Sequence, residues 1–160
     1  MRRSKEESER WFEQADFDLE SAKRNFEQQI YSYTCFMCEQ AAQKALKAYL
    51  IFKGERYIWE HSIQKLAEKC SNFDAEFSKF EKFGVILDKY YLTTRYPDAI
   101  APPAIPYQSF TEKEGSDAIK MVEEIVDLVM VKLRGDVWNK KTENNTLGTQ
   151  INADDKNQHG

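Results

Sequence analysis

Apolar residues recur at three- and four-residue steps along the chain, the spacing that places side chains on one face of an α-helix. The first such stripe consists of Phe12, Ala15, Leu19, Ala22 and Phe26. It predicts an amphipathic helix from about Lys5 to Gln28, with glutamate and lysine on the opposite face. Ser4 and Glu7 have the spacing of a capping box, in which each side chain satisfies a free amide of the first turn. We therefore expect this helix to begin near Ser4.

The second stretch, from Tyr31 to Phe52, is apolar over most of its circumference. This pattern predicts a helix buried in the centre of a bundle. Its small residues, which let neighbouring helices approach closely, are Ala41, Ala42, Ala45 and Ala48. Gly54 has the place of a glycine that follows a helix C-terminus, so we expect the helix to end just before it.

The polar residues of this second helix are concentrated on one face. Gln40, Lys44 and Lys47 follow one another at four- and three-residue spacing, and Gln43 lies beside them. Two interpretations of the lysines are open. Their ammonium groups extend along the apolar surface to water, or they face a wet cleft between helices or subunits.

The middle of the chain predicts a loop, a short helix and a third long helix. The loop, 55–60, carries two aromatic residues that we expect to be exposed, Tyr57 and Trp59. His61 and Ser62 then start a short helix whose inner side holds Ile63, Leu66, Ala67 and Cys70. The stripe of the third long helix continues across Gly84 and consists of Phe73, Phe77, Phe80, Leu87 and Tyr91. Pro97 removes a backbone donor and excludes Tyr96 from the helical region, so this helix should end near residues 94–96.

The last part of the chain predicts one more helix and a tail. Residues 99–106 contain three prolines and should lie extended over the surface. Thr111 and Glu114 again have capping-box spacing, and the stripe that follows is Ala118, Val122, Ile125, Val129 and Leu133. The prediction is an all-α, up-and-down bundle of four long helices and one short helix over residues 1–134. Residues 135–160 show no period and are expected to form a disordered tail, in which Trp138 is the one residue expected to pack back.

Composition narrows the class of protein. The 160 residues are 41% hydrophobic and 31% charged, which suits one folded domain with a helical surface. The net charge of −4 argues against a DNA-binding protein, so any anion site should be a local patch. We find no apolar run as long as a membrane span and no signal core near Met1, and three cysteines suit a reducing compartment. We therefore expect a cytoplasmic protein that contacts neither membrane nor DNA.

Few residues carry recognisable chemistry. Cys35 and Cys38 have the spacing of a redox or zinc pair, but a metal needs two more ligands and a redox pair needs a strand-to-helix context. We interpret them as buried, small apolar side chains. His61 is the only histidine within the predicted bundle, and a structural hydrogen bond is its commoner role. The sequence has no nucleophile–histidine–acid arrangement and no glycine-rich phosphate loop. We predict neither a metal site nor catalytic residues.

Arg95 and Asp98 fall at the end of the third helix, beside Tyr90, Tyr91 and Tyr96. An arginine has a planar, permanently charged fork that suits phosphate or carboxylate. From the local sequence alone a structural role is the commoner interpretation, because a cation near a helix C-terminus satisfies the last carbonyls and the helix dipole.

Three segments resemble the HEPN family, the "higher eukaryotes and prokaryotes nucleotide-binding" domains. They are Cys-Phe-Met-Cys-Glu-Gln-Ala-Ala-Gln-Lys-Ala-Leu-Lys-Ala-Tyr-Leu (35–50), His61-Ser62-Ile63, and Tyr-Tyr-Leu-Thr-Thr-Arg-Tyr-Pro-Asp-Ala (90–99). The resemblance runs from about Trp11 to Leu133. It implies an all-α bundle, a homodimer, and nucleotides in a cleft or cavity at the dimer. Among eukaryotic members the chain is most similar to a domain of a very large chaperone-related protein, which implies chaperone partners through a parent chain.

The resemblance also bears on catalysis. Many HEPN domains are metal-independent RNases with an arginine followed, after four to six residues, by a histidine. Arg95 matches the arginine, but the corresponding positions hold Ile100, Ala101 and Pro102, none of which can transfer a proton. His61 can replace the histidine only if the fold brings it to the same place. We therefore predict binding without RNA cleavage.

The prediction that follows is a dimeric module that binds GTP or ATP and holds no tightly bound cofactor. The side chains expected to hold the phosphates are Lys44, Lys47, Arg56 and Arg95. Tyr91 or Tyr96 offers a ring for the base or for stacking of the arginine, Asp98 orients Arg95, and Gln40 and His61 support the site. The alternative is a homodimerisation module without a ligand, in which Lys44 and Arg95 pair with Glu39 or Asp98 across the interface.

Overall fold

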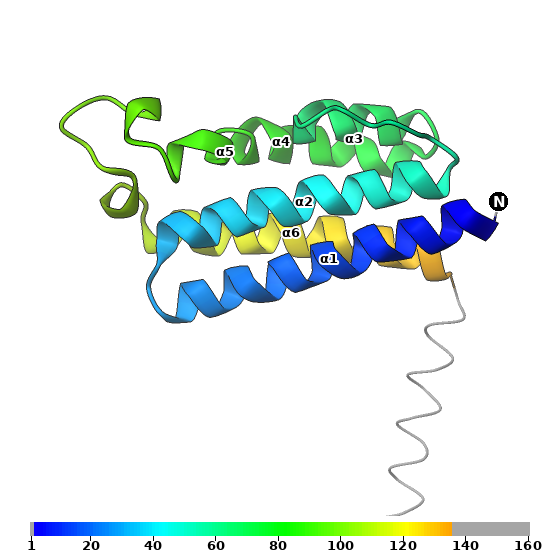
Figure 1. Cartoon of the computed structure of the whole chain (residues 1–160), viewed down its shortest axis with the longest axis horizontal. Coiled ribbons are helices and arrows are strands. Elements are labelled where there is room, and N and C mark those ends of the chain that lie inside the picture. The colour runs from blue at the N-terminus through cyan, green and yellow to red at the C-terminus, as the bar shows by residue number, and fades with distance from the viewer. Residues whose placement is uncertain (1, 136–160) are drawn as a thin grey trace, which may run out of the picture.

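The computed structural model describes residues 2–135, and these form a helical bundle (Figure 1). Helix α2 (Tyr31–Phe52) lies in the middle. On one side of it run α1 (Arg2–Glu27) and α6 (Glu112–Arg134), and on the other side lie the shorter α3 (Ile63–Ser71), α4 (Glu81–Leu87) and α5 (Tyr90–Thr93). The described part of the chain has no strand, so the predicted all-α bundle is confirmed. No helix within residues 2–135 is long and apolar enough to cross a membrane.

Helix α2 is buried as its sequence predicts, and its bounds agree with the prediction. The four alanines are completely buried, which brings the backbones of neighbouring helices close. Cys35 and Cys38 are buried free thiols, and burial raises the pKa of both well above the ordinary value. They are therefore packing groups, as we inferred. Gly54 has φ +96°, and the N–H of Glu55 donates to the carbonyl of Leu50, so the helix ends in a Schellman motif.

Of the helix starts expected near Ser4, at His61–Ser62 and after Thr111, the last two are confirmed and the first is wrong. Ser62 caps α3 by accepting a hydrogen bond from the N–H of Lys65, and Thr111 with Glu114 forms a complete capping box for α6. Helix α1, however, already includes Arg2, so Ser4 lies inside it and does not cap it. Arg2 donates to Glu6 one turn later, a pairing that supports the earlier start.

The third long helix is not continuous. It is divided into the 3₁₀ turn η1 (Ala75–Phe80), α4 and α5, with a break at residues 88–89. The break shifts the buried position by one residue. Tyr90 is buried, while Tyr91, which the predicted stripe placed inside, is 36% exposed. Phe73, expected on the inner face, is 46% exposed because it precedes η1. Phe77, Phe80 and Leu87 are buried as predicted.

The chain then leaves the bundle through a loop that contains two further 3₁₀ turns, η2 (Pro97–Ala99) and η3 (Pro106–Gln108). Residues 100–105 are non-helical, as their prolines require. The whole stripe of α6 is buried, which confirms the last helix. The predicted disordered tail and Trp138 fall on residues 136–160, outside the described residues.

Candidate functional site

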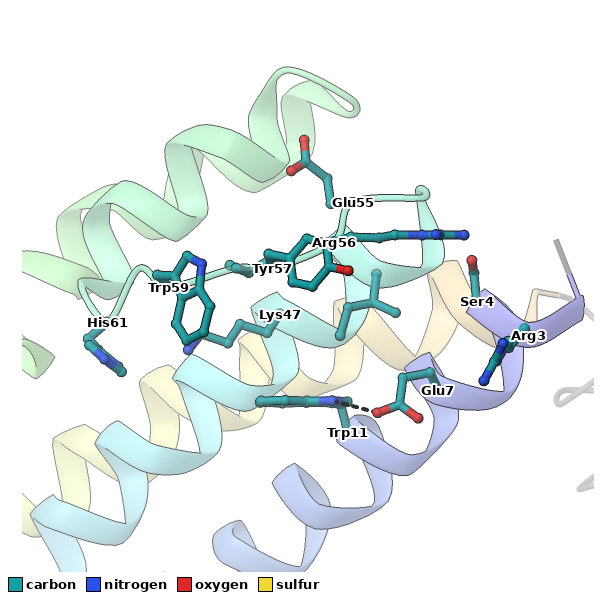
Figure 2. Close-up of a pocket in the computed structure, with 12 residues that line it drawn as sticks. Arg3, Ser4, Glu7, Trp11, Lys47, Glu55, Arg56, Tyr57, Trp59 and His61 are labelled. Atoms are coloured by element: carbon teal, nitrogen blue, oxygen red, sulfur yellow. Dashed lines mark hydrogen bonds between the residues drawn. The ribbon is translucent and has the colours of Figure 1, made fainter.

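A pocket of about 810 Å³ lies between the start of α1, the C-terminal half of α2 and the segment 53–62 that follows α2 (Figure 2). Twelve residues line it: Arg3, Ser4, Glu7, Trp11, Lys47, Ile51, Glu55, Arg56, Tyr57, Ile58, Trp59 and His61. Three cationic side chains and two carboxylates share this lining, and three aromatic rings provide its apolar walls. The combination suits an anion that carries a flat ring.

The segment 53–62 places aromatic side chains over the pocket. The αL conformation of Gly54 turns the chain back over α2, and Tyr57 also has positive φ, +58°. Tyr57 and Trp59 are 82% and 81% exposed, as the sequence predicts, although both are large rings. On the α1 side, Trp11 is half-buried and donates its indole N–H to Glu7 at 3.2 Å. Rings therefore lie on both sides of the pocket.

Lys47 is the most buried cation of the lining. It is 5% exposed, and its ammonium lies 5.7 Å from the centroid of the Trp11 ring. Desolvation lowers its pKa, since removing the charge from water disfavours the ammonium form. Within residues 2–135 this ammonium makes no ion pair, so a bound anion would relieve part of the cost of burying it.

Lys44, one turn earlier, is in a different environment. Its Nζ lies 2.5 Å from Oδ2 of Asp18 on α1, and Asp18 is buried. The ion pair holds α1 against α2. Lys44 does not line the pocket. The predicted contact of Lys44 with a nucleotide stays a prediction, and it requires this pair to open.

Arg95 lies near the N-terminal half of α2. Its guanidinium carbon is 4.0 Å from the centroid of the Phe36 ring, 5.0 Å from that of Tyr96 and 5.4 Å from that of Tyr91. Nε of Arg95 donates to the carbonyl of Tyr91 at 3.1 Å, and Nη2 donates to the same oxygen. This is the contact expected of a cation that satisfies a helix end. Asp98 is exposed in η2, and in the described part of the chain no ion pair joins it to Arg95.

A row of polar side chains connects the two regions. Glu39 is completely buried, and its carboxylate accepts hydrogen bonds from Gln40 and Gln43, both at 2.7 Å. Burial raises the pKa of Glu39, and these two hydrogen bonds oppose that rise. The amide oxygen of Gln43 lies 3.0 Å from Nδ1 of His61, and the His61 ring stacks on Tyr91 with centroids 5.9 Å apart. His61 thus lines the pocket and also stacks on Tyr91, one of the three rings that surround the guanidinium of Arg95 (the Arg95 cluster: Arg95, Phe36, Tyr91 and Tyr96).

Of the predicted binding residues, the fold brings Lys47, Arg56 and His61 into one pocket and places the others elsewhere. Phe36, under Arg95, and Lys47 are eleven residues apart on α2, which corresponds to about 16 Å. Sequence reasoning did not find Arg3 and Trp11, and it named Tyr57 and Trp59 only as exposed aromatics. The available signal was a tryptophan on the predicted first helix, outside the apolar stripe. The described residues contain no cluster of histidine, cysteine or acidic side chains that could hold a metal ion.

Comparison with known proteins decides the family. A family model described as the HEPN domain matches residues 8–134. The chain belongs to the HEPN domain family. Two solved structures resemble this HEPN domain: TT1696 from Thermus thermophilus, with a TM-score of 0.72, and ST0689, described as an archaeal HEPN homologue, with a TM-score of 0.63.

Both structures are 32% identical to the chain in sequence. The first match covers 78% of this chain and 97% of TT1696, and the second covers 79% of this chain and 97% of ST0689. No curated protein is significantly similar to the chain. The HEPN family is linked to nucleotide binding or RNase activity, and the pocket and the Arg95 cluster are the two places where such chemistry can be sought.

Proposed function

We propose that this HEPN domain binds a purine nucleoside triphosphate, GTP or ATP, in the pocket lined by Lys47 and Arg56, and that it does not cleave RNA. The observation that carries the proposal is Lys47, a side chain only 5% exposed, whose ammonium opens on the pocket beside the Trp11 ring and makes no ion pair within residues 2–135. A triphosphate would supply the negative charge that pairs with the Lys47 ammonium. A purine would cover the exposed rings of Tyr57 and Trp59.

The size and charge of the pocket agree with this ligand. A volume of about 810 Å³ lies within the range of ordinary small-molecule sites, roughly 300–1,000 Å³. Figure 2 shows Arg56 reaching toward Ser4 and Arg3 at one end of the pocket, with Trp59 and His61 at the other end. In the proposed complex, the phosphates run from Lys47 toward Arg56 and Arg3, and the nucleoside lies against Trp59 and His61.

We further propose that the domain works as a homodimer. Arg95, Tyr91 and Tyr96 lie outside this pocket, so their predicted contact with the nucleotide requires a second subunit. A set of exposed apolar side chains supports such an interface: Val85, Ile86, Leu92, Tyr96, Ile105 and Tyr107. The same observation supports the second candidate function, a homodimerisation module with no ligand.

The residues near Arg95 support the proposed lack of RNase activity. The residues where HEPN RNases carry their histidine are Ile100, Ala101 and Pro102. The guanidinium of Arg95 is hydrogen-bonded to the carbonyl of Tyr91 and packed on Phe36, and the His61 ring contacts the Tyr91 ring and shares a hydrogen bond at Nδ1 with Gln43. The proposal also keeps the resemblance to the C-terminal HEPN domain of sacsin, and with it a cytoplasmic, chaperone-related parent chain.

Calorimetric titration with GTP and ATP tests the proposal. Binding should fall at least tenfold in Lys47→Met, and Arg56→Ala should weaken it in the same direction. The matched control, Lys113→Met, removes an exposed lysine of α6 and should bind like wild type. The melting temperature should rise with nucleotide, which a pure dimerisation module does not predict. An absence of heat with both nucleotides would overturn the proposal, and cleavage of single-stranded RNA that disappears in Arg95→Ala would overturn its non-catalytic part.

A further inference from the structure

His61 has a defined hydrogen-bonding state, set by two buried residues of α2. Oε1 of Glu39 accepts a hydrogen bond from Nε2 of Gln43 at 2.7 Å, which leaves only the amide oxygen of Gln43 for His61. That oxygen lies 3.0 Å from Nδ1 of His61. Because an amide oxygen only accepts hydrogen bonds, Nδ1 must carry the proton. The neutral ring is therefore the Nδ1–H tautomer, and its Nε2 has a free lone pair.

The free nitrogen is available to a ligand. His61 is exposed and lines the pocket, and its Nδ1 edge is turned to Gln43 on α2. Nε2 of the same ring makes no hydrogen bond within residues 2–135. Stacking on Tyr91, with an angle of 11° between the rings, holds the ring plane. Burial of Glu39 and Gln43 keeps water from competing for their hydrogen bonds.

In the Nδ1–H tautomer, Nε2 of the neutral His61 ring cannot bind an ionised phosphate. Oxygens of an ionised phosphate accept hydrogen bonds, as does Nε2 in this tautomer, so the two repel each other. Guanidinium groups suit phosphate, and those of Arg56 and Arg3 lie at the opposite end of the pocket from His61, whereas the Lys47 side chain ends beside Trp59 (Figure 2). The His61 end of the pocket suits the nucleoside half of a nucleotide.

We propose that His61 is a specificity-determining residue that accepts a hydrogen bond from a donor on the nucleoside, and that Glu39 and Gln43 are positioning residues that fix its tautomer. The inference rests on the proposed nucleotide-binding function. Donors of this kind are the ribose hydroxyls and the exocyclic amino group of the base. The site therefore recognises two features of a nucleotide: its negative charge, and a hydrogen-bond donor on its nucleoside that reaches His61.

Binding of three triphosphates to the whole chain tests the inference. ATP is compared with 2′,3′-dideoxy-ATP, which lacks both ribose hydroxyls, and with purine riboside triphosphate, which lacks the amino group. One of the two analogues should bind about tenfold more weakly than ATP, the scale of one hydrogen bond, and its identity names the donor. If both analogues bind as tightly as ATP, the inference is overturned while the proposed function stands. If ATP itself does not bind, the proposed function fails instead.

A nitrogen-15 spectrum of the ring tests the positioning role without any ligand. The His159→Asn variant leaves His61 as the single histidine of the chain. The neutral ring should show the Nδ1–H form, and Gln43→Leu should convert it to the Nε2–H form that free imidazole side chains prefer in water. The control is Gln14→Leu, which removes another glutamine that donates to a carboxylate, that of Asp18, away from the pocket. The Nε2–H form in the parent protein, or an unchanged tautomer in a folded Gln43→Leu, would overturn the inference.

Discussion

Oδ1 of Asp88 accepts a hydrogen bond at 2.6 Å from the backbone N–H of Ile63, the first residue of α3. The other oxygen of the same carboxylate accepts from the hydroxyl of Ser62 at 2.7 Å and from the N–H of Gln64 at 3.3 Å. A carboxylate at a helix N-terminus also interacts favourably with the helix dipole. Asp88, at the break between α4 and α5, thus fixes the start of α3 directly after His61.

Asp88→Ala should therefore lower the free energy of unfolding by about 2 kcal/mol, because free amides at the start of α3 lose their acceptor. Asp88→Asn should cost less, since its amide oxygen still accepts. Urea denaturation of the variants measures both effects. Asp16→Ala, at an exposed position of α1, is the control and should stay within about 0.5 kcal/mol of wild type. Equal stabilities of Asp88→Ala and wild type would show that the carboxylate does not cap α3.

Removing either partner of the ion pair between Lys44 and Asp18 should lower the free energy of unfolding, but by unequal amounts. The side chain of Asp18 is 8% exposed and that of Lys44 26%. Lys44→Ala leaves a buried carboxylate with one remaining donor, Gln14, and should lower the free energy of unfolding by about 2–3 kcal/mol. Asp18→Ala should cost less, because the freed ammonium can move to water.

A double-mutant cycle measured by urea denaturation gives the coupling between Lys44 and Asp18. It should exceed the coupling of the exposed pair between Lys113 and Asp117, which should be below about 0.5 kcal/mol. Coupling energies of the same size for the two pairs would contradict a role for burial.

Gly84 allows α4 to approach α3 very closely. A Cβ built on Gly84 would lie 2.3 Å from the backbone nitrogen of Gln64, closer than two atoms can approach without a backbone shift. Gly84→Ala should therefore lower the free energy of unfolding by more than about 2 kcal/mol. Gly54→Ala is the matched control, since its Cβ would meet no atom within 4 Å and its positive φ costs only about 1 kcal/mol. A smaller loss for Gly84→Ala than for Gly54→Ala, in thermal or urea unfolding, would contradict the close approach.

These contacts also show which parts of the structure the sequence predicts. The bounds of α2 and the starts of α3 and α6 depend on local signals, namely an apolar run, Gly54 and the capping residues Ser62 and Thr111. Local signals are sufficient there because the partners lie within a few residues. The sequence predicts the third helix as one piece because its stripe is nearly periodic, and the break at Asp88 follows from a contact with α3, 25 residues earlier.

The candidate site depends still more on contacts between distant segments. Lys44 and Lys47 share a face in any helical conformation, but Asp18 on α1 pairs with the first and leaves the second beside Trp11. Arg3 reaches the pocket because α1 begins earlier than its capping signal suggested. The residue spacing within one helix cannot predict these contacts, because they depend on how α1 packs against α2.

The buried carboxyl group of Glu39 predicts a pH dependence of stability. Burial raises its pKa in the folded state above the ordinary value, so from the ordinary carboxyl range upward the native state binds more protons than the unfolded state. The free energy of unfolding then decreases as the pH rises, up to the raised pKa of the native state, and below the ordinary pKa the group contributes no dependence. One such group contributes a slope of at most about 1.4 kcal/mol per pH unit.

Glu39→Gln removes this titration while keeping a polar side chain at the same place. The free energy of unfolding of the variant minus that of wild type should therefore increase with pH from about pH 4.5, on top of a constant offset from the altered hydrogen bonds to Gln40 and Gln43. Urea denaturation at a series of pH values between 4 and 8 measures this difference. Glu13→Gln, at an exposed position of α1, should give a difference that is nearly flat with pH. If the Glu39→Gln curve runs parallel to wild type over the whole range, the carboxyl group of Glu39 has the same pKa folded and unfolded, and its burial is without electrostatic cost.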